Sequence, residues 1–223
     1  MIQLLKNKVA IVACSADSVT VSIARLFLQQ GASVMFVGTY PELSDEVPEF
    51  ADQTRWACLQ ADITDPVEAR YCVSETLKKF GRADIFFYYP DLAEDAFFSP
   101  VGQSSEHAII TYAQNMWSQI VDTFPLLRSA DSSNIIVVAD TPSDAELSHV
   151  GEVQSEEHRI RIDLINAKQS YHPKRQQSLL AQKQLTPERI ARLSLSVLVK
   201  EKQEEVEWNE VLSWTSEYLD NSF

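Results

Sequence analysis

The stretch Lys8-Val9-Ala10-Ile11-Val12-Ala13 decides the fold, because it is a short apolar run near the start of the chain. Such a run is typical of a strand that is buried on both faces of a sheet. Ser18 to Gln30 then carries apolar side chains at helical spacing and is followed by Gly31, a residue type that commonly ends helices. Ser33 to Gly38 is a second apolar run. This order predicts two parallel strands joined by a helix.

The alternation of strand and helix patterns continues along the chain and predicts a doubly wound parallel sheet. The polar and acidic stretch Ser143 to His158 shows neither pattern. We therefore expect a single Rossmann-like α/β domain over residues 1–223, with about six parallel strands. Beyond the first unit, strands are expected at Thr54 to Ala61, Asp84 to Tyr89, Asn134 to Ala139 and Arg159 to Ala167, and helices at Asp65 to Phe80, Ser105 to Arg128, Thr186 to about Lys202 and Glu204 to Phe223.

Charge and composition exclude several classes of function. Nineteen basic and thirty-two acidic residues give a net charge of −13 at pH 7, which argues against a nucleic-acid partner. No apolar run reaches the ~18 residues of a membrane span. The three cysteines, Cys14, Cys58 and Cys72, are odd in number and lack the spacing of metal ligands, so we expect a cytoplasmic protein without a metal site.

Several segments between Leu5 and Ala191 resemble the short-chain dehydrogenase/reductase family and follow the family's order and spacing. The resemblance implies the family's Rossmann fold and, for a typical member, hydride transfer with a nicotinamide cofactor. The segments are Leu5 to Val12, Ile23 to Phe27, Gly31 to Val34, Ala61 to Asp65, Phe80 to Ile85, Pro125 to Leu127, Ile160 to Asp163 and Pro187 to Ala191.

The positions of the family's cofactor motifs hold unusual residues. The glycine-rich turn between the first strand and the first helix corresponds to a stretch with Cys14, Ser18 and Thr20 at the glycine positions. Glycine lets the backbone approach a dinucleotide's pyrophosphate, and the carboxylate of Asp17 adds negative charge at the helix N-terminus, which otherwise attracts phosphate. Asp62 matches the family's adenine-contacting acid, although it suits a cap or a turn equally well.

The positions of the family's catalytic motifs are altered as well. The Asn-Asn-Ala-Gly stretch corresponds to Tyr88-Tyr89-Pro90-Asp91, the helix asparagine to Tyr112 and the catalytic serine to Asp140. Asp140 to Ile160 is too short for the family's active-site helix, so we expect a truncation around residues 141–158 and an atypical chain after residue 168. The spacing of the catalytic Tyr-x-x-x-Lys pair falls on Val153 and Glu157.

These departures lead to the hypothesis of a non-redox pseudoenzyme that binds no cofactor and acts as a binding or partner subunit or a pathway scaffold. A second hypothesis is a repurposed enzyme that performs cyclisation, dehydration or isomerisation in the cleft where the family binds its cofactor, called the old cleft below. Its candidate catalytic residues are Asp140, Tyr112, Tyr88 and Tyr89. The third is an atypical NAD(P)-dependent oxidoreductase, which family membership alone implies. An open cleft favours the second hypothesis. Tyrosines that fill the cleft, and acidic residues that cap helices, favour the first.

Two further features bear on partners. The stretch from Lys168 to Arg192 holds six basic residues and one acidic residue, which suits either an acidic partner or a solvated helix face. Without the active-site helix, the expected helix at Ser105 to Arg128 lacks its family dimer contact and needs another cover. We therefore expect a protein partner or a homo-oligomer with a non-family interface, with a small-molecule ligand in the old cleft as an alternative.

Overall fold

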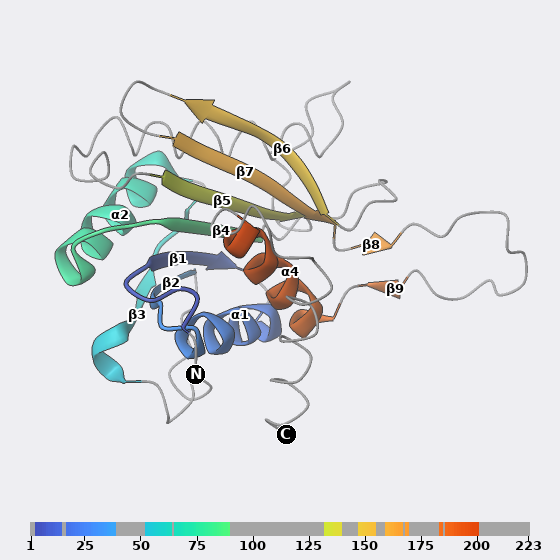
Figure 1. Ribbon diagram of the computed structural model, residues 1–223. Coiled ribbons are helices and arrows are strands. Elements are labelled where there is room, and N and C mark those ends of the chain that lie inside the picture. Colours follow the sequence, from blue (N-terminus) through green and yellow to red (C-terminus); the bar gives the residue numbers. More distant parts are fainter. Residues whose placement is uncertain are drawn as a thin grey trace, which may run out of the picture.

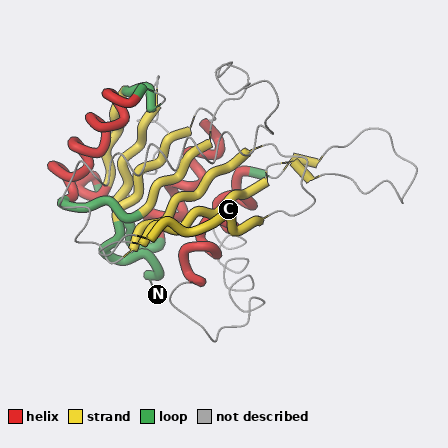
Figure 2. The backbone as a smooth tube through the Cα atoms, turned by 90° about the horizontal axis from the view of Figure 1, so that it is seen from above, coloured by secondary structure: helices red, strands yellow, loops and turns green. Residues whose placement is uncertain are grey.

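The chain, shown as a computed structural model, forms a seven-stranded sheet with helices on both faces (Figure 1). Helices α1 (Asp17–Gln29) and α4 (Pro187–Lys200) cover one face, and α2 (Pro66–Phe80) covers the other. Figure 2 shows the twisted strands between these two helical layers. The residues that the structure describes are 3–14, 17–38, 52–63, 65–89, 132–139, 147–154, 159–166, 168–169, 183–184 and 186–200.

The sheet has the order β3-β2-β1-β4-β5-β7-β6, in which neighbours are hydrogen-bonded. Six of these strands are parallel, and β6 alone runs antiparallel to its neighbour β7. The prediction of a Rossmann-like, doubly wound parallel sheet is therefore confirmed. The strands are β1 (Val9–Cys14), β2 (Ser33–Gly38), β3 (Trp56–Gln60), β4 (Ile85–Tyr89), β5 (Ser132–Ala139), β6 (Leu147–Gln154) and β7 (Arg159–Asn166).

Helix α2 begins and ends where its sequence predicts. The Asp65 carboxylate accepts hydrogen bonds from the N–H groups of Val67 (2.6 Å) and Glu68 (3.4 Å), and Pro66 occupies the first helical position. At the other end Gly81 has a φ of 80°, a left-handed conformation that glycine adopts at low cost, and its N–H donates to the carbonyl of Leu77. Local capping chemistry therefore fixes both ends of α2.

The carbonyl of Leu28 near the C-terminus of α1 accepts hydrogen bonds from two residues that follow the helix. Gly31 has a φ of 89° and donates its N–H to the carbonyl of Leu28 (3.1 Å). Arg55, in the 3-10 turn η2 (Gln53–Arg55) before β3, donates to that same carbonyl over 3.1 Å. A cation is favourable here because the carbonyls at a helix C-terminus carry partial negative charge.

Apolar side chains pack against both faces of the sheet. On the α1 and α4 side, Phe27 and Leu195 lie against strand residues such as Phe36 and Ile136. On the α2 side, Cys72 and Val73 belong to an apolar cluster that also contains residues of β1, β2, β4, β5 and β7. Strands buried on both faces read as continuous apolar runs, which is why the first strand was recognisable from its sequence.

The structure differs from the sequence prediction at β6, within a stretch to which no element was assigned. A β-bulge between His149 and Gly151 shifts the register of β6 on β7 and breaks the simple alternation that marks a strand. Helix α4 and β7 lie close to their predicted bounds. The expected helices at Ser105 to Arg128 and Glu204 to Phe223 lie outside the described residues, and none of the described helices is long and apolar enough to span a membrane.

Candidate functional site

The six parallel strands end at one edge of the sheet, called the carboxyl edge below. β1 ends there at Cys14, and α1 follows it in the sequence. The neighbours of β1 in the sheet are β2 on one side, which continues to β3, and β4 on the other side, which continues to β5. The strand order therefore reverses direction between β1 and β4. In open α/β sheets a ligand binds in the crevice outside such a switch point. The fold places the candidate site beside Cys14 and Tyr89, which are register partners.

The turn from β1 to α1 brings together the positions that correspond to the family's glycines. Cys14 is the last residue of β1, Asp17 is the first residue of α1, and Ser18 and Thr20 lie in the first turn of the helix. The free N–H groups of a helix N-terminus attract anions. The sequence has no glycine before Gly31, so every backbone position of this turn carries a Cβ.

Tyr88 and Tyr89 do not fill a common cleft. Tyr88 is 2% exposed, belongs to the cluster on the α2 side, and stacks on Phe86 with ring centroids 6.1 Å apart. Tyr89 is half-buried and packs against the cluster on the α1 and α4 side. Successive side chains of a strand point to opposite faces, which separates the two phenols. Of this pair, Tyr89 at the very end of β4 lies closest to the switch point along the strand.

Asp62 lies in the turn that follows β3, as one of its two interpretations expected. Its carbonyl accepts a hydrogen bond from the N–H of Asp65 (3.1 Å), and its own N–H donates to the carboxylate of Glu68. Asp65 and not Asp62 is the residue that caps α2. The exposed side chain of Asp62 stands on the carboxyl edge, two strands away from β1.

The remaining candidate residues lie outside the described part of the chain. Asp140 and Tyr112 are the two candidate catalytic residues that fall there. The structure thus gathers Cys14, Tyr88 and Tyr89 at neighbouring strand ends. The roles of all these residues in binding or catalysis stay predictions.

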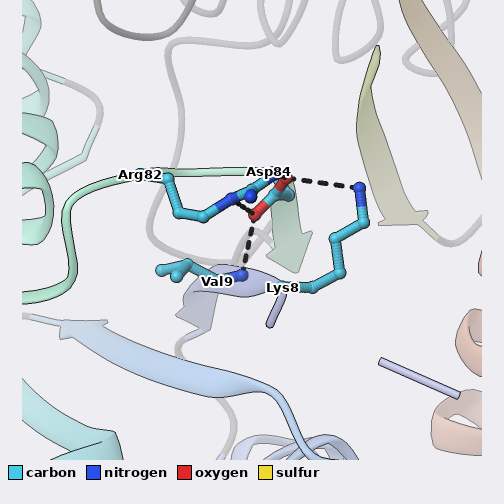
Figure 3. Close-up of polar contacts among 4 residues, drawn as sticks. All are labelled: Lys8, Val9, Arg82 and Asp84. Carbon is cyan, nitrogen blue, oxygen red and sulfur yellow. Dashed lines mark hydrogen bonds and ion pairs between the residues drawn. The ribbon is translucent and has the colours of Figure 1, made fainter. Parts of the chain in front are cut away.

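A buried carboxylate that the sequence analysis did not single out holds β1 and β4 together at the opposite edge of the sheet (Figure 3). Asp84, only 1% exposed, accepts hydrogen bonds from the N–H of Val9 at 2.9 Å and from Arg82 Nε at 2.7 Å, and it forms an ion pair with Lys8 Nζ at 3.3 Å. Backbone bonds reinforce the contact, since Asp84 N–H donates to the Val9 carbonyl. Asp84 therefore fixes the register of the two strands that flank the switch point.

A second buried carboxylate repeats this arrangement on β7. Asp163 is 1% exposed and accepts a two-pronged hydrogen bond from Arg161, at 2.8 Å from Nε and 3.1 Å from Nη2. In both cases the arginine precedes the aspartate by two residues, which places the two side chains on one face of an extended chain. The Arg-x-Asp pattern is the sequence signal for such a pair.

Cys58 and Cys72 are not reactive thiols, and no metal-binding group is found in the described segments. Burial, assisted by the neighbouring Glu68 carboxylate, raises the pKa of the Cys72 thiol to about 12, and burial raises the pKa of Cys58 as well. Both are therefore neutral near neutral pH and poorly nucleophilic. Within the described segments, no three His, Cys, Asp or Glu residues are grouped so as to hold a metal ion.

Comparison with known proteins relates part of this chain to a family. The family profile described as Enoyl-(Acyl carrier protein) reductase matches residues 13–122, from the β1–α1 turn past the end of β4. Short-chain dehydrogenase reductase 5 of Arabidopsis thaliana is 32% identical over 85 residues. Over this part of its length the chain is similar to the short-chain dehydrogenase/reductase family.

Other similar proteins match parts of this chain. Zerumbone synthase of Zingiber zerumbet is 35% identical over 82 residues, which are 36% of this chain and 31% of that protein. The match to Short-chain dehydrogenase reductase 5 covers 38% of this chain and 33% of the relative, so the chain spans about a third of the length of the curated relatives it matches. A crystal structure of a short-chain dehydrogenase/reductase from Caenorhabditis elegans superimposes with a TM-score of 0.47 at 21% identity, covering 64% of this chain and 57% of that one.

The expectation of a non-redox pseudoenzyme is wrong, and non-redox chemistry in the old cleft has no support either. The similarity is to a reductase profile and to relatives that include a named short-chain dehydrogenase reductase. The profile match starts at Ala13 near the end of β1 and so includes the turn that was expected to have lost its function. The expectation gave decisive weight to single positions such as Cys14, whereas the profile match extends over residues 13–122 as a whole.

The site fits a dinucleotide in its topology but not in the residues of its turn. The switch point and the start of α1 lie where the phosphates of such a cofactor bind in Rossmann folds. In the sequence, Cys14, Ser18 and Thr20 stand at the positions where the family has glycine, and Asp17, the first residue of α1, adds a negative charge at the helix start.

Proposed function

We propose that the protein is an oxidoreductase of the short-chain dehydrogenase/reductase type, whose nucleotide ligand lies across the carboxyl ends of β1 and β4. The observation that carries this proposal is the reductase-profile match over residues 13–122, which includes both strand ends and the turn between β1 and α1. A nicotinamide dinucleotide supplies hydride when it is bound to an enzyme of this type.

The chain's own contribution in this proposal is a place to bind and orient. The N-terminus of α1 offers backbone N–H groups to a phosphate, and Tyr89, half-buried at the end of β4 and in register with Cys14, offers an aromatic side chain beside the switch point. The register of β1 on β4, fixed by Asp84 at the far edge, sets the distance between these two features.

The test is a calorimetric titration of the full chain with NADH and with NADPH, followed by a search for dinucleotide oxidation with aldehydes, ketones and enones. Saturable binding is expected, weakened by Tyr89→Ala. Complete lack of binding at about millimolar dinucleotide would make the proposal wrong.

Asp17→Asn provides a directional test of the binding place. Removing a negative charge from the first residue of α1 is expected to tighten dinucleotide binding about two- to fivefold. Asp52→Asn is the matched control, because it removes the same charge in front of η2, at the opposite edge of the sheet, and should leave binding unchanged. Equal effects of the two changes would show that the ligand senses only net charge.

A further inference from the structure

The outward face of α2 carries a stripe of side chains at the spacing of a helix–helix contact. The side of α2 that faces the sheet holds its buried residues, which are Ala69, Cys72, Val73 and Thr76. The opposite side holds an outer stripe, whose members are separated by four, three and four residues: Val67, Tyr71, Ser74 and Lys78. Two helices that pack along a common seam use this spacing. Both overall views place α2 on the outside of the described structure (Figures 1 and 2).

The outer stripe contains apolar surface that is open to water. Val67 is 71% exposed and Tyr71 is 50% exposed, and they are the only large apolar side chains that are exposed within the part of the chain that the structure describes. They lie four residues apart, so their side chains are neighbours on the helix surface. A single exposed apolar residue is ordinary, whereas two neighbours on one helix stripe form a surface that gains free energy when another helix covers it.

The charged residues of α2 are sorted by sign along the helix. Asp65 and Glu68 lie at its start and Lys78 and Lys79 lie in its last turn, and all four are exposed. This order suits the dipole of the helix itself. It also makes the helix complementary to a second helix that runs in the opposite direction, because each acidic end then meets a basic end.

An antiparallel pair of α2 helices brings the apolar parts of two outer stripes into contact. When the pair is centred between Tyr71 and Ser74, Tyr71 of each copy lies opposite Ser74 of the other, and the small serine leaves room for the ring. Val67 of each copy then lies opposite Lys78 of the other, because both residues are equally far from that centre. The aliphatic part of a lysine side chain covers apolar surface while its ammonium group stays in water.

We propose that two copies of this chain associate through α2, packed antiparallel about a two-fold axis. Glu68 and Lys79 lie on the same flank of the outer stripe, so the axis places Glu68 of each copy near Lys79 of the other. The same surfaces meet twice, which closes the dimer. A nucleic acid is a poorer occupant, because it would also meet the acidic start of the helix. α2 has 15 residues and is about 22 Å long, so the interface is small and we expect a weak dimer with a dissociation constant of about 10–100 μM.

Sedimentation velocity of the full chain over about 5–500 μM measures this association. Tyr71→Glu places a charge in the seam and should raise the dissociation constant at least about tenfold, and Tyr71→Ser, which only removes the ring, should raise it as well. Lys79→Glu should also raise it about tenfold, because it sets like charges against each other at both ends of the pair. Lys6→Glu is the matched control, because it makes the same change of charge at an exposed residue before β1 and should leave the dimer intact.

Charge exchange tests which residues meet. Glu68→Lys should weaken the dimer when alone, and an equal mixture of Glu68→Lys with Lys79→Glu should associate more tightly than either variant, because both ends of the mixed pair then join opposite charges. A wild-type chain that stays monomeric at about 500 μM overturns the proposal. So does a dimer that Tyr71→Glu leaves intact, an equal loss in Lys6→Glu, or a mixture that associates no better than its components.

Crosslinking tests the direction of the two helices. Ser74→Cys lies beside the two-fold axis, so a bismaleimide with a span of about 8 Å should join its two copies in a yield above that of the wild-type chain. Val67→Cys lies on the same stripe, but its two copies are about 16 Å apart along an antiparallel pair and should not be joined. Equal crosslinking at both positions would indicate parallel helices and would overturn the proposed arrangement.

Discussion

Replacing Asp84 tests whether one buried carboxylate holds β1 and β4 together. Asp84→Ala removes the acceptor of the Val9 N–H, a group that is itself buried, and an unsatisfied buried donor costs about 1–3 kcal/mol. The two cations behave differently, because the side chains of Lys8 and Arg82 are 29% and 42% exposed and regain water. Each lost ion pair therefore adds at most about 1 kcal/mol. The free energy of unfolding is expected to fall by about 2–4 kcal/mol.

Urea unfolding and thermal unfolding measure this loss. For a chain of 223 residues, a fall of that size lowers the melting temperature by about 4–16 °C. Asp84→Asn retains one acceptor oxygen and should fall between wild type and Asp84→Ala. Lys78→Ala, which breaks the exposed pair with Glu75, is the control and should leave the free energy of unfolding nearly unchanged.

Hydrogen exchange locates the effect. The Val9 amide should lose protection in Asp84→Ala before the amides of β7 do, because its acceptor is removed directly. The reasoning fails if Lys8→Ala destabilises as much as Asp84→Ala, since the exposed cation and not the buried N–H would then dominate. It fails equally if Asp84→Ala costs less than about 1 kcal/mol.

Three further predictions rest on single contacts. Asp163→Ala removes the carboxylate that accepts both hydrogen bonds from Arg161, whose side chain is only 15% exposed. The free energy of unfolding measured in urea should fall by about 3–5 kcal/mol. Adding Arg161→Met to the same chain should restore part of this loss. Asp65→Ala removes the cap of α2 and should cost about 1 kcal/mol, whereas an unchanged midpoint would show that the cap contributes nothing. Because the pKa of Cys72 is raised to about 12, its alkylation by iodoacetamide at about pH 8 should be about a thousandfold slower in the folded chain than in urea. The same shift has no effect on stability below about pH 9, where the thiol is neutral in both states, and it lowers the free energy of unfolding as the pH rises towards about 12, because the unfolded chain ionises first. The fall in stability over that range should therefore be smaller in Cys72→Ala.

Local chemistry made much of the fold predictable. Pro66 after Asp65 and the glycine at position 81 determine the ends of α2 through hydrogen bonds within a few residues, so a short window of sequence contains the whole cause. The buried strands β1 and β2 were equally visible, because burial on both faces leaves only apolar residues in a row.

The bulged edge strand β6 shows where such reasoning stops. Its register shift between His149 and Gly151 breaks the two-residue period, and its pairing depends on β7, which supplies the only partner strand among the described elements. A strand defined by a neighbour rather than by its own pattern is hard to detect in one sequence. The acidic residues nearby favoured a loop.

The candidate site was predictable in place but not in arrangement. Parallel strands bring Cys14 and Tyr89 to one edge, which the alternation of strands and helices already implied. The expectation that Tyr88 and Tyr89 fill one cleft overlooked the alternation of faces along β4, which sends Tyr88 into the α2-side core. Asp84 was missed because its importance comes from Val9, which is 75 residues away in the sequence.

The β6–β7 hairpin has a consequence for the order in which the chain acquires its structure. Only residues 155–158 separate β6 from β7, and hairpins of this kind form within about microseconds. Pairing of β1 with β4 instead has to close the much longer loop between Val9 and Asp84, which are 75 residues apart in the sequence. We therefore expect the β6–β7 hairpin to form before β1 pairs with β4. The switch point, which depends on the slower closure, is completed later.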